Sequence, residues 1–67
     1  MSLAKVIEIL AEGETIEDAF DNAAAEASET VDDIQSIWAS DIEAKVEDGE
    51  IQHYRITAKV TFAVNKS

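Results

Sequence analysis

The 67-residue sequence contains no cysteine, one histidine, one tryptophan and only two glycines. Without cysteine the chain forms neither disulfides nor thiolate metal sites, which excludes a disulfide-stapled secreted scaffold. Because Gly13 and Gly49 are the only glycines, no glycine-rich loop is available to cradle a phosphate. These absences remove several common designs for binding metals and nucleotides.

Basic residues are also scarce, since five Lys and Arg stand against 15 Asp and Glu and give a formal net charge of -10. Nucleic-acid binding needs a basic patch that releases counterions, and docking on an anionic membrane also needs cations. No apolar run approaches the roughly 20 residues of a membrane helix, and no signal-peptide pattern opens the chain. We therefore expect no nucleic-acid or membrane partner and a cytoplasmic location.

The hydrophobic pattern predicts a strand followed by a helix in the first half of the chain. The segment 5–10 is rich in β-branched residues and ends in a loop around Gly13. Thr15 is the predicted N-cap of the helix, and Asp32-Asp33 is predicted to end it. Apolar residues recur there at spacings of three and four, as on one stripe of a helix: Ile16, Ala19, Phe20, Ala23, Ala27 and Val31.

The second half of the chain predicts a long β-hairpin. An extended segment runs from about Ile34 to Glu47, and the Asp48-Gly49 pair is typical of a tight hairpin turn. The strand, helix, strand, strand order predicts an α+β fold, in which a three-stranded antiparallel sheet carries one helix on one face. The length allows a single domain over residues 1–67. The polar side of the closing strand consists of His53, Arg55, Thr57, Lys59 and Thr61.

The predicted subunit is incomplete by itself. One helix covers only one face of the sheet, and the segment from Ile34 to Glu47 would reach roughly 45 Å, beyond the usual length of about 20 Å. Domains of this size are also marginally stable without disulfides or metals. We therefore expect the long strand to bend or to extend onto a neighbour, and the chain to assemble with copies of itself.

Trp38 is the candidate platform for a ligand. Strict alternation along its strand predicts that Trp38 shares a face with Ile42 and Val46, in the core or in a subunit interface. A bend between Ala39 and Asp41 would instead present the indole at an interface or in a ligand pocket, and a planar ring among small residues suits stacking on an aromatic molecule. Both interpretations are open at this stage.

The charged residues suggest binding rather than catalysis. His53 is the only histidine, so no Ser-His-Asp arrangement is available, and we predict that the chain is not an enzyme. Arg55 either pairs with a carboxylate of a neighbour or donates to the edge of a ligand ring. Three acidic groups offer oxygens for a hard cation, although none has EF-hand spacing and a solvated surface is the alternative. These groups are Asp32-Asp33, Asp41-Glu43 and Glu47-Asp48-Glu50.

The order and spacing of these segments over residues 5–64 resemble the dodecin family. The resemblance implies a β-α-β-β subunit of a hollow homododecamer, which binds riboflavin or FMN for storage or sequestration without catalysis. The matching segments are Lys5-Val6-Ile7-Glu8-Ile9, Ile16-Glu17-Asp18-Ala19, Glu29-Thr30-Val31, Val46-Glu47-Asp48-Gly49, Tyr54-Arg55-Ile56 and Lys59-Val60-Thr61-Phe62.

The resemblance also implies candidate cofactor-binding residues. Flavin-binding dodecins stack the flavin on a Trp early in the second strand and carry a Gln after the Tyr of the third strand. These positions fall on Ser36 and Arg55 in this sequence. Trp38, two residues later, keeps the same strand parity and is the candidate to replace the missing indole. A Tyr-Arg third strand also resembles dodecins without the stacking Trp, for which the alternative is a calcium-binding or purely structural shell without flavin.

Overall fold

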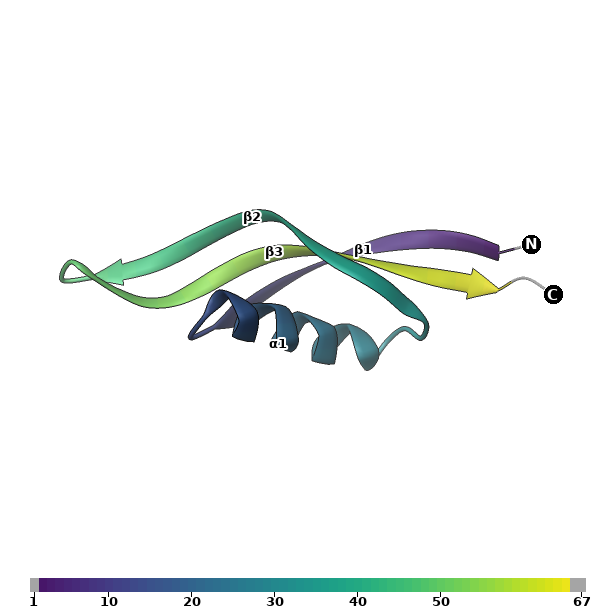
Figure 1. Cartoon of the computed structure of the whole chain (residues 1–67), viewed down its shortest axis with the longest axis horizontal. Coiled ribbons are helices and arrows are strands. Elements are labelled where there is room, and N and C mark those ends of the chain that lie inside the picture. Colours follow the sequence, from purple (N-terminus) through teal and green to yellow (C-terminus); the bar gives the residue numbers. More distant parts are fainter. Residues whose placement is uncertain (1, 66–67) are drawn as a thin grey trace.

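Figure 1 shows the computed structural model, which describes residues 2–65. The chain runs through β1 (Ser2–Gly13), α1 (Ile16–Ser28), β2 (Ile34–Glu47) and β3 (Glu50–Asn65). This order confirms the predicted α+β fold with a β-α-β-β arrangement. The predicted domain also includes three terminal residues that lie outside the described residues, namely Met1, Lys66 and Ser67.

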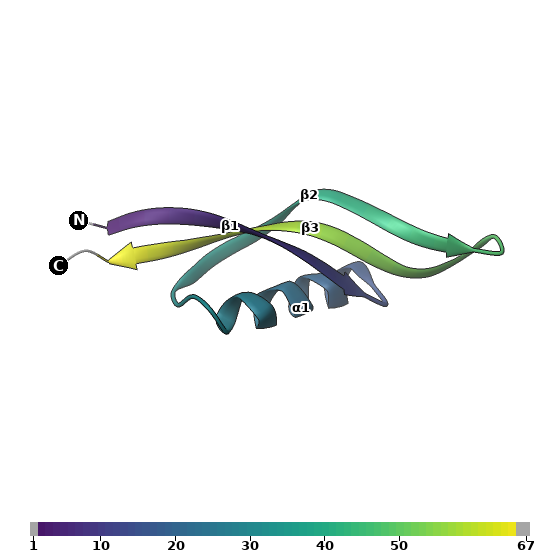
Figure 2. The same ribbon diagram turned by 180° about the vertical axis from the view of Figure 1, so that it is seen from behind.

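The strands form one antiparallel sheet in the order β1-β3-β2. β3 is therefore the central strand, and β1 pairs with it from Ser2 opposite Asn65 to Gly13 opposite Tyr54. The helix α1 lies along one face of the sheet, as the front and back views show (Figure 1, Figure 2). We call this side the helix face. The opposite side, which no element among residues 2–65 covers, is called the open face.

The helix α1 begins where the sequence predicts and ends earlier than predicted. Thr15 caps its start, because the side-chain oxygen accepts a 3.0 Å hydrogen bond from the backbone N–H of the third helical residue. The last helical residue is Ser28, so the prediction that the helix continues to Val31 is wrong. The Ala27 carbonyl accepts bonds from both the N–H and the hydroxyl of Thr30 and from the N–H of Val31, which closes the last turn.

The core lies between α1 and the middle of the sheet, and it is small. Ile56 and Val60 are the largest fully buried side chains among residues 2–65, and the helix contributes alanines that allow it to approach the strands closely. Gly13 permits the same close approach, because a Cβ atom there would lie 2.4 Å from the backbone nitrogen of Ala19. The buried residues are Ala11, Ala19, Ala23, Ala27, Ile56, Ala58 and Val60. A core of this size stabilises a lone subunit only weakly.

The molecule is elongated, with principal extents of 54 × 18 × 14 Å. Its radius of gyration is 13.9 Å, against about 11 Å for a compact chain of this length. β2 bends and, with β3, extends past the helix as an arm (Figure 1), as the length of β2 predicts. The arm ends in the predicted tight turn, where Asp48 and Gly49 have φ angles of 53° and 78°. Apolar residues on the arm are more than half exposed, namely Ile42, Val46 and Ile51.

Candidate functional site

A bulge in β2 determines which face of the sheet Trp38 occupies. The pairing with β3 shifts by one residue between Ala39 and Asp41, so Ser40 is an extra residue that breaks the alternation of the strand. Trp38 pairs with a lysine on the open face, whereas Ile42 pairs with a buried isoleucine of the helix face. The prediction that strict alternation places Trp38 on the face of Ile42 is therefore wrong. The bend considered as the alternative is present.

Ser36 and Trp38 are neighbours on the open face. Each has a partner on β3 that points to the same side, Thr61 for Ser36 and Lys59 for Trp38. Trp38 is 48% exposed, so its indole is not part of the core of the subunit. The pairing assigns the following residues, among others, to the open face: Val6, Glu8, Leu10, Glu12, Ser36, Trp38, Asp41, Glu43, Lys45, His53, Arg55, Thr57, Lys59 and Thr61.

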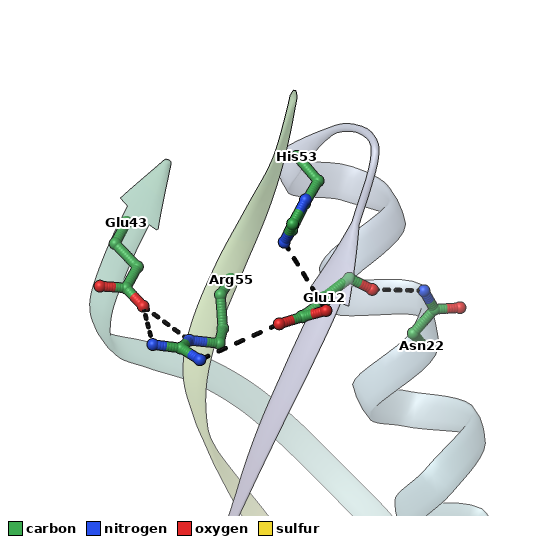
Figure 3. A network of polar contacts seen from close by, with 5 residues as sticks. All are labelled: Glu12, Asn22, Glu43, His53 and Arg55. Atoms are coloured by element: carbon green, nitrogen blue, oxygen red, sulfur yellow. Dashed lines mark hydrogen bonds and ion pairs between the residues drawn. The ribbon is translucent and has the colours of Figure 1, made fainter. Parts of the chain in front are cut away.

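Arg55 is the centre of a set of charged side chains that crosses all three strands, and we call Glu12, Arg55 and Glu43 the charged row. Arg55 is directly opposite Glu12 in β1 and Glu43 in β2. Its Nε donates a 2.6 Å hydrogen bond to Glu43, Nη2 pairs with the same carboxylate, and Nη1 lies 4.0 Å from Glu12 (Figure 3). His53 lies 3.7 Å from Glu12, whose backbone carbonyl accepts a 2.6 Å bond from Asn22. Arg55 thus pairs with two carboxylates of its own chain.

A second ion pair lies beside Trp38. Lys59, opposite Trp38 in the register, has Glu8 as its partner in β1, and its Nζ lies 2.6 Å from the Glu8 carboxylate. Lys59 and Arg55 are four residues apart on β3, which corresponds to about 13 Å along the strand. The structure therefore brings Ser36 and Trp38 together and places Arg55 further along the same face.

A shallow hollow lies beside the charged row. Its volume of about 320 Å³ is near the lower end of the range for small-molecule sites. Its lining combines two carboxylates and one guanidinium with apolar and hydroxyl groups. The lining residues are Leu10, Asp41, Ile42, Glu43, Arg55 and Thr57. Trp38 is not part of this lining, so a molecule that contacts both must extend along the sheet.

Residues 2–65 contain no group of three or more His, Asp or Glu side chains that could hold a metal ion. Asp41 and Glu43 line the hollow, but Asp32-Asp33 lies in the loop before β2 and Asp48 lies in the hairpin turn. Within the same residues, no helix combines the length and the apolar character needed to cross a membrane.

The side chains of the open face suit the flat ring system of a flavin. An isoalloxazine ring stacks on aromatic or apolar surface, which Trp38 offers at 48% exposure and Leu10 at 65%. The ring edge bears hydrogen-bond acceptors and an N–H donor. These groups match the hydroxyl of Ser36 and the guanidinium of Arg55 as donors, and the carboxylate of Glu43 as an acceptor. The residues present are therefore compatible with a bound flavin.

The sequence analysis did not find the partners of Arg55 and Lys59. Glu12 and Glu8 lie in β1, more than 40 positions earlier in the chain, and they become neighbours of these cations only through the register of β1 with β3. A signal was present, because Glu8 and Glu12 of β1 are four residues apart, as are Arg55 and Lys59 of β3. The register that aligns the two series could not be read from the pattern alone.

Comparison with known proteins identifies the fold. A dodecin from Streptomyces davaonensis is 23% identical, with a TM-score of 0.86 over 97% of both chains. A dodecin from Streptomyces coelicolor is 22% identical, with a TM-score of 0.86 over 98% of this chain and 96% of that one. A variant of the Thermus thermophilus dodecin is 20% identical, with a TM-score of 0.88 over 100% of both chains.

Sequence comparison extends this likeness from the fold to the family. A search among curated proteins found no match to this chain. A family model described as Dodecin matches residues 3–65, which is nearly the whole length of the chain. This match agrees with the resemblance in the sequence and with the β-α-β-β arrangement of the structure. The chain therefore belongs to the dodecin family.

Proposed function

We propose that the chain is the subunit of a hollow homododecamer that binds and stores a flavin without catalysing a reaction on it. The main observation behind this proposal is Trp38, an indole that is 48% exposed on the open face of a dodecin fold. Exposed apolar and aromatic surface is typical of sites that a ligand or another protein copy covers. Membership of the dodecin family supports a flavin as that ligand.

In this proposal Trp38 is the stacking platform, and Ser36 and Arg55 are its polar neighbours. The flavin, riboflavin or FMN, supplies a photoreactive aromatic ring, and the chain binds this ring, orients it and excludes water from it. Contact between an indole and an isoalloxazine quenches the excited state of the flavin and so protects it from light. Such storage requires geometry rather than an acid, a base or a nucleophile, and His53 with Glu12 is the nearest approach to an acid–base pair on this face.

Several features of the subunit support self-assembly. Ile56 and Val60 are the largest side chains fully buried in the described part of the chain. Apolar side chains on the arm and the open face are exposed, including Val46 at 61% and Leu10 at 65%. Contacts with further copies would bury this surface and stabilise a subunit whose small core makes it only marginally stable alone. We expect the assembly in the cytoplasm.

The first experiment is a native mass spectrum of freshly purified protein without added ligand. We expect a species of twelve times the 7.3 kDa chain mass, with additional mass increments of flavin size. The same assembly with neither bound flavin nor quenching of added flavin would contradict flavin storage and favour the calcium-binding or purely structural shell. A monomer or dimer would contradict the proposed dodecamer itself.

A further inference from the structure

We propose that this site takes an uncharged flavin and discriminates against flavins that carry a phosphate group. The inference rests on the proposed function and deepens it, because it names the class of flavin and the residues that select it. Arg55 lines the hollow, and Lys59 is opposite Trp38 on the open face. Both cations already pair with carboxylates of the same chain.

Arg55 is held by the charged row. Its Nε and Nη2 both face one oxygen of Glu43, and its Nη1 faces Glu12 from the other side (Figure 3). The backbone register places these three residues directly opposite one another, so the pairing follows from the sheet and not from one choice of side-chain rotamer. A phosphate that approached Arg55 would therefore compete with these carboxylates for its N–H groups and meet their negative charge.

The surroundings of the row are acidic. The hollow contains Asp41 and Glu43 against one guanidinium, and Glu12 adds a further carboxylate at its edge. The second cation, Lys59, is paired with Glu8 at 2.6 Å. A phosphate monoester has a charge of about −1.5 to −2 at pH 7, so it meets like charge at short range. The net charge of -10 on each chain adds repulsion at longer range.

The basic residues that follow along the sheet, toward the hairpin turn, also lie among carboxylates. Lys45 and His53 line a second hollow of about 510 Å³, which lies toward the hairpin turn. Its lining also contains Glu43 and Glu47, so the carboxylates outnumber the single lysine when the histidine is neutral. Both hollows therefore place a carboxylate beside every cation that a phosphate could approach.

An uncharged flavin avoids this repulsion and can use the same carboxylates. The ribityl chain of riboflavin bears hydroxyl groups, which donate hydrogen bonds to carboxylate oxygens. Asp41 and Glu43 are acceptors of this kind at the edge of the hollow. The residues that repel the phosphorylated ligand are therefore suitable acceptors for the unphosphorylated one.

The test compares riboflavin with FMN, which differ only by the phosphate. The assembled protein, freed of ligand, is titrated with each compound at low ionic strength, and binding is measured by the quenching of flavin fluorescence. We expect riboflavin to bind at least about tenfold more tightly. The difference should shrink at about 0.5 M salt, because salt screens exposed charges. Equal affinities or tighter binding of FMN would overturn the inference and leave flavin storage intact, whereas quenching by neither compound would overturn both proposals.

The variant Glu43→Gln tests which residues select the ligand. It keeps the shape of the side chain but removes the charge that holds Arg55, so we expect the affinity for FMN to rise severalfold. The affinity for riboflavin should fall, because an amide oxygen is a weaker acceptor for hydroxyl groups than a carboxylate, so the preference for riboflavin over FMN should shrink. Glu26→Gln is the matched control, because it removes the same charge from an exposed position of α1, on the other side of the sheet. An equal rise of FMN affinity in both variants would show that net charge alone excludes the phosphate and would refute the role of the charged row.

Discussion

The two faces of the sheet come from the same strands but have opposite compositions. The helix face is apolar, and at its centre Ile56 and Ala58 are completely buried beneath the alanines of α1. The open face alternates apolar side chains with ion pairs, and its largest aromatic residue, Trp38, is 48% exposed. The helix face holds the subunit together. The open face is available for contact with ligands and further copies.

The difference in composition gives the two faces different roles: the helix face stabilises the subunit and, in the proposed function, the open face recognises its ligand. Complete burial of a side chain such as Ile56 contributes about 1.5–3 kcal/mol to folding, whereas an exposed ion pair contributes about 0–1 kcal/mol. The pairs made by Arg55 and Lys59 involve side chains that are about one third exposed, 37% and 31%, so their contribution belongs to the lower range. The charged row therefore affects mainly what the open face accepts.

The largest expected effect comes from a deletion that turns side chains of β2 from one face of the sheet to the other. Deleting Ala44 shifts the preceding part of β2 by one residue, which turns Asp41 and Glu43 toward the helix face. The same shift moves Trp38 into the place of Ala39, opposite the fully buried Ala58, where the bulky indole overpacks the space beside α1, so we expect the deletion to prevent folding. Deleting Ser40 from the same strand is the control, because it removes only the bulge and leaves the pairing on either side in register. We expect the deletion of Ser40 to lower the free energy of unfolding by about 1–2 kcal/mol. Circular dichroism measures the folded structure of the two deletion variants, and urea unfolding measures their stability. An equal loss of stability in both variants would contradict the assignment of Ser40 as a bulge.

The next effect tests the helix face alone. Ile56→Ala removes a fully buried side chain and leaves a cavity, so we expect a loss of about 2–5 kcal/mol in the free energy of unfolding. Ile51→Ala makes the same chemical change at a residue that is 55% exposed on the arm. Urea unfolding at a fixed protein concentration measures both, because the stability of an assembly depends on concentration. A loss for Ile51→Ala as large as that for Ile56→Ala would show that contacts between copies stabilise the arm as strongly as the core.

The fold could be predicted from the sequence because its signals are local and repeated. The helical stripe, the N-cap at Thr15 and the Asp48-Gly49 turn each determine structure within a few residues. The bounds of β2 also agree with the prediction, Ile34–Glu47. The end of α1 was misplaced because apolar spacing continues to Val31, while the hydrogen bonds of Thr30 to the Ala27 carbonyl close the helix first.

The candidate site was harder to predict because it depends on non-local pairing. One extra residue, Ser40, reverses the side to which Trp38 points. The step of three residues from Ala39 to Ile42 in an otherwise alternating series is a trace of this bulge, but Trp38 is itself apolar and fits the alternation on either side of it. The partners of Arg55 are equally non-local, since Glu12 and Glu43 lie on different strands on either side of β3. The candidate residues could therefore be named from the sequence as a prediction, but the face of the sheet that they share could not.

Replacement of Trp38 tests the open face as a ligand platform. We expect Trp38→Ala to weaken flavin binding by at least about tenfold and to abolish quenching, because the stacking surface is removed. The assembly should survive, as shown by native mass spectrometry. Trp38→Phe should retain part of the affinity, and Ile51→Ala is the control for lost apolar surface, because Ile51 is 55% exposed on the arm and lines neither hollow. Unchanged quenching in Trp38→Ala would remove Trp38 from the proposed site.

The smallest expected effect concerns the ion pair beside Trp38. Lys59→Gln removes the partner of Glu8, and since both side chains are partly exposed we expect a stability change below about 1 kcal/mol in urea unfolding. Riboflavin binding should change little, whereas FMN binding should weaken further, because the carboxylate of Glu8 is then no longer neutralised. A loss of stability above about 2 kcal/mol would mean that the ion pairs hold the sheet together, and the division between a stabilising face and a recognising face would fail.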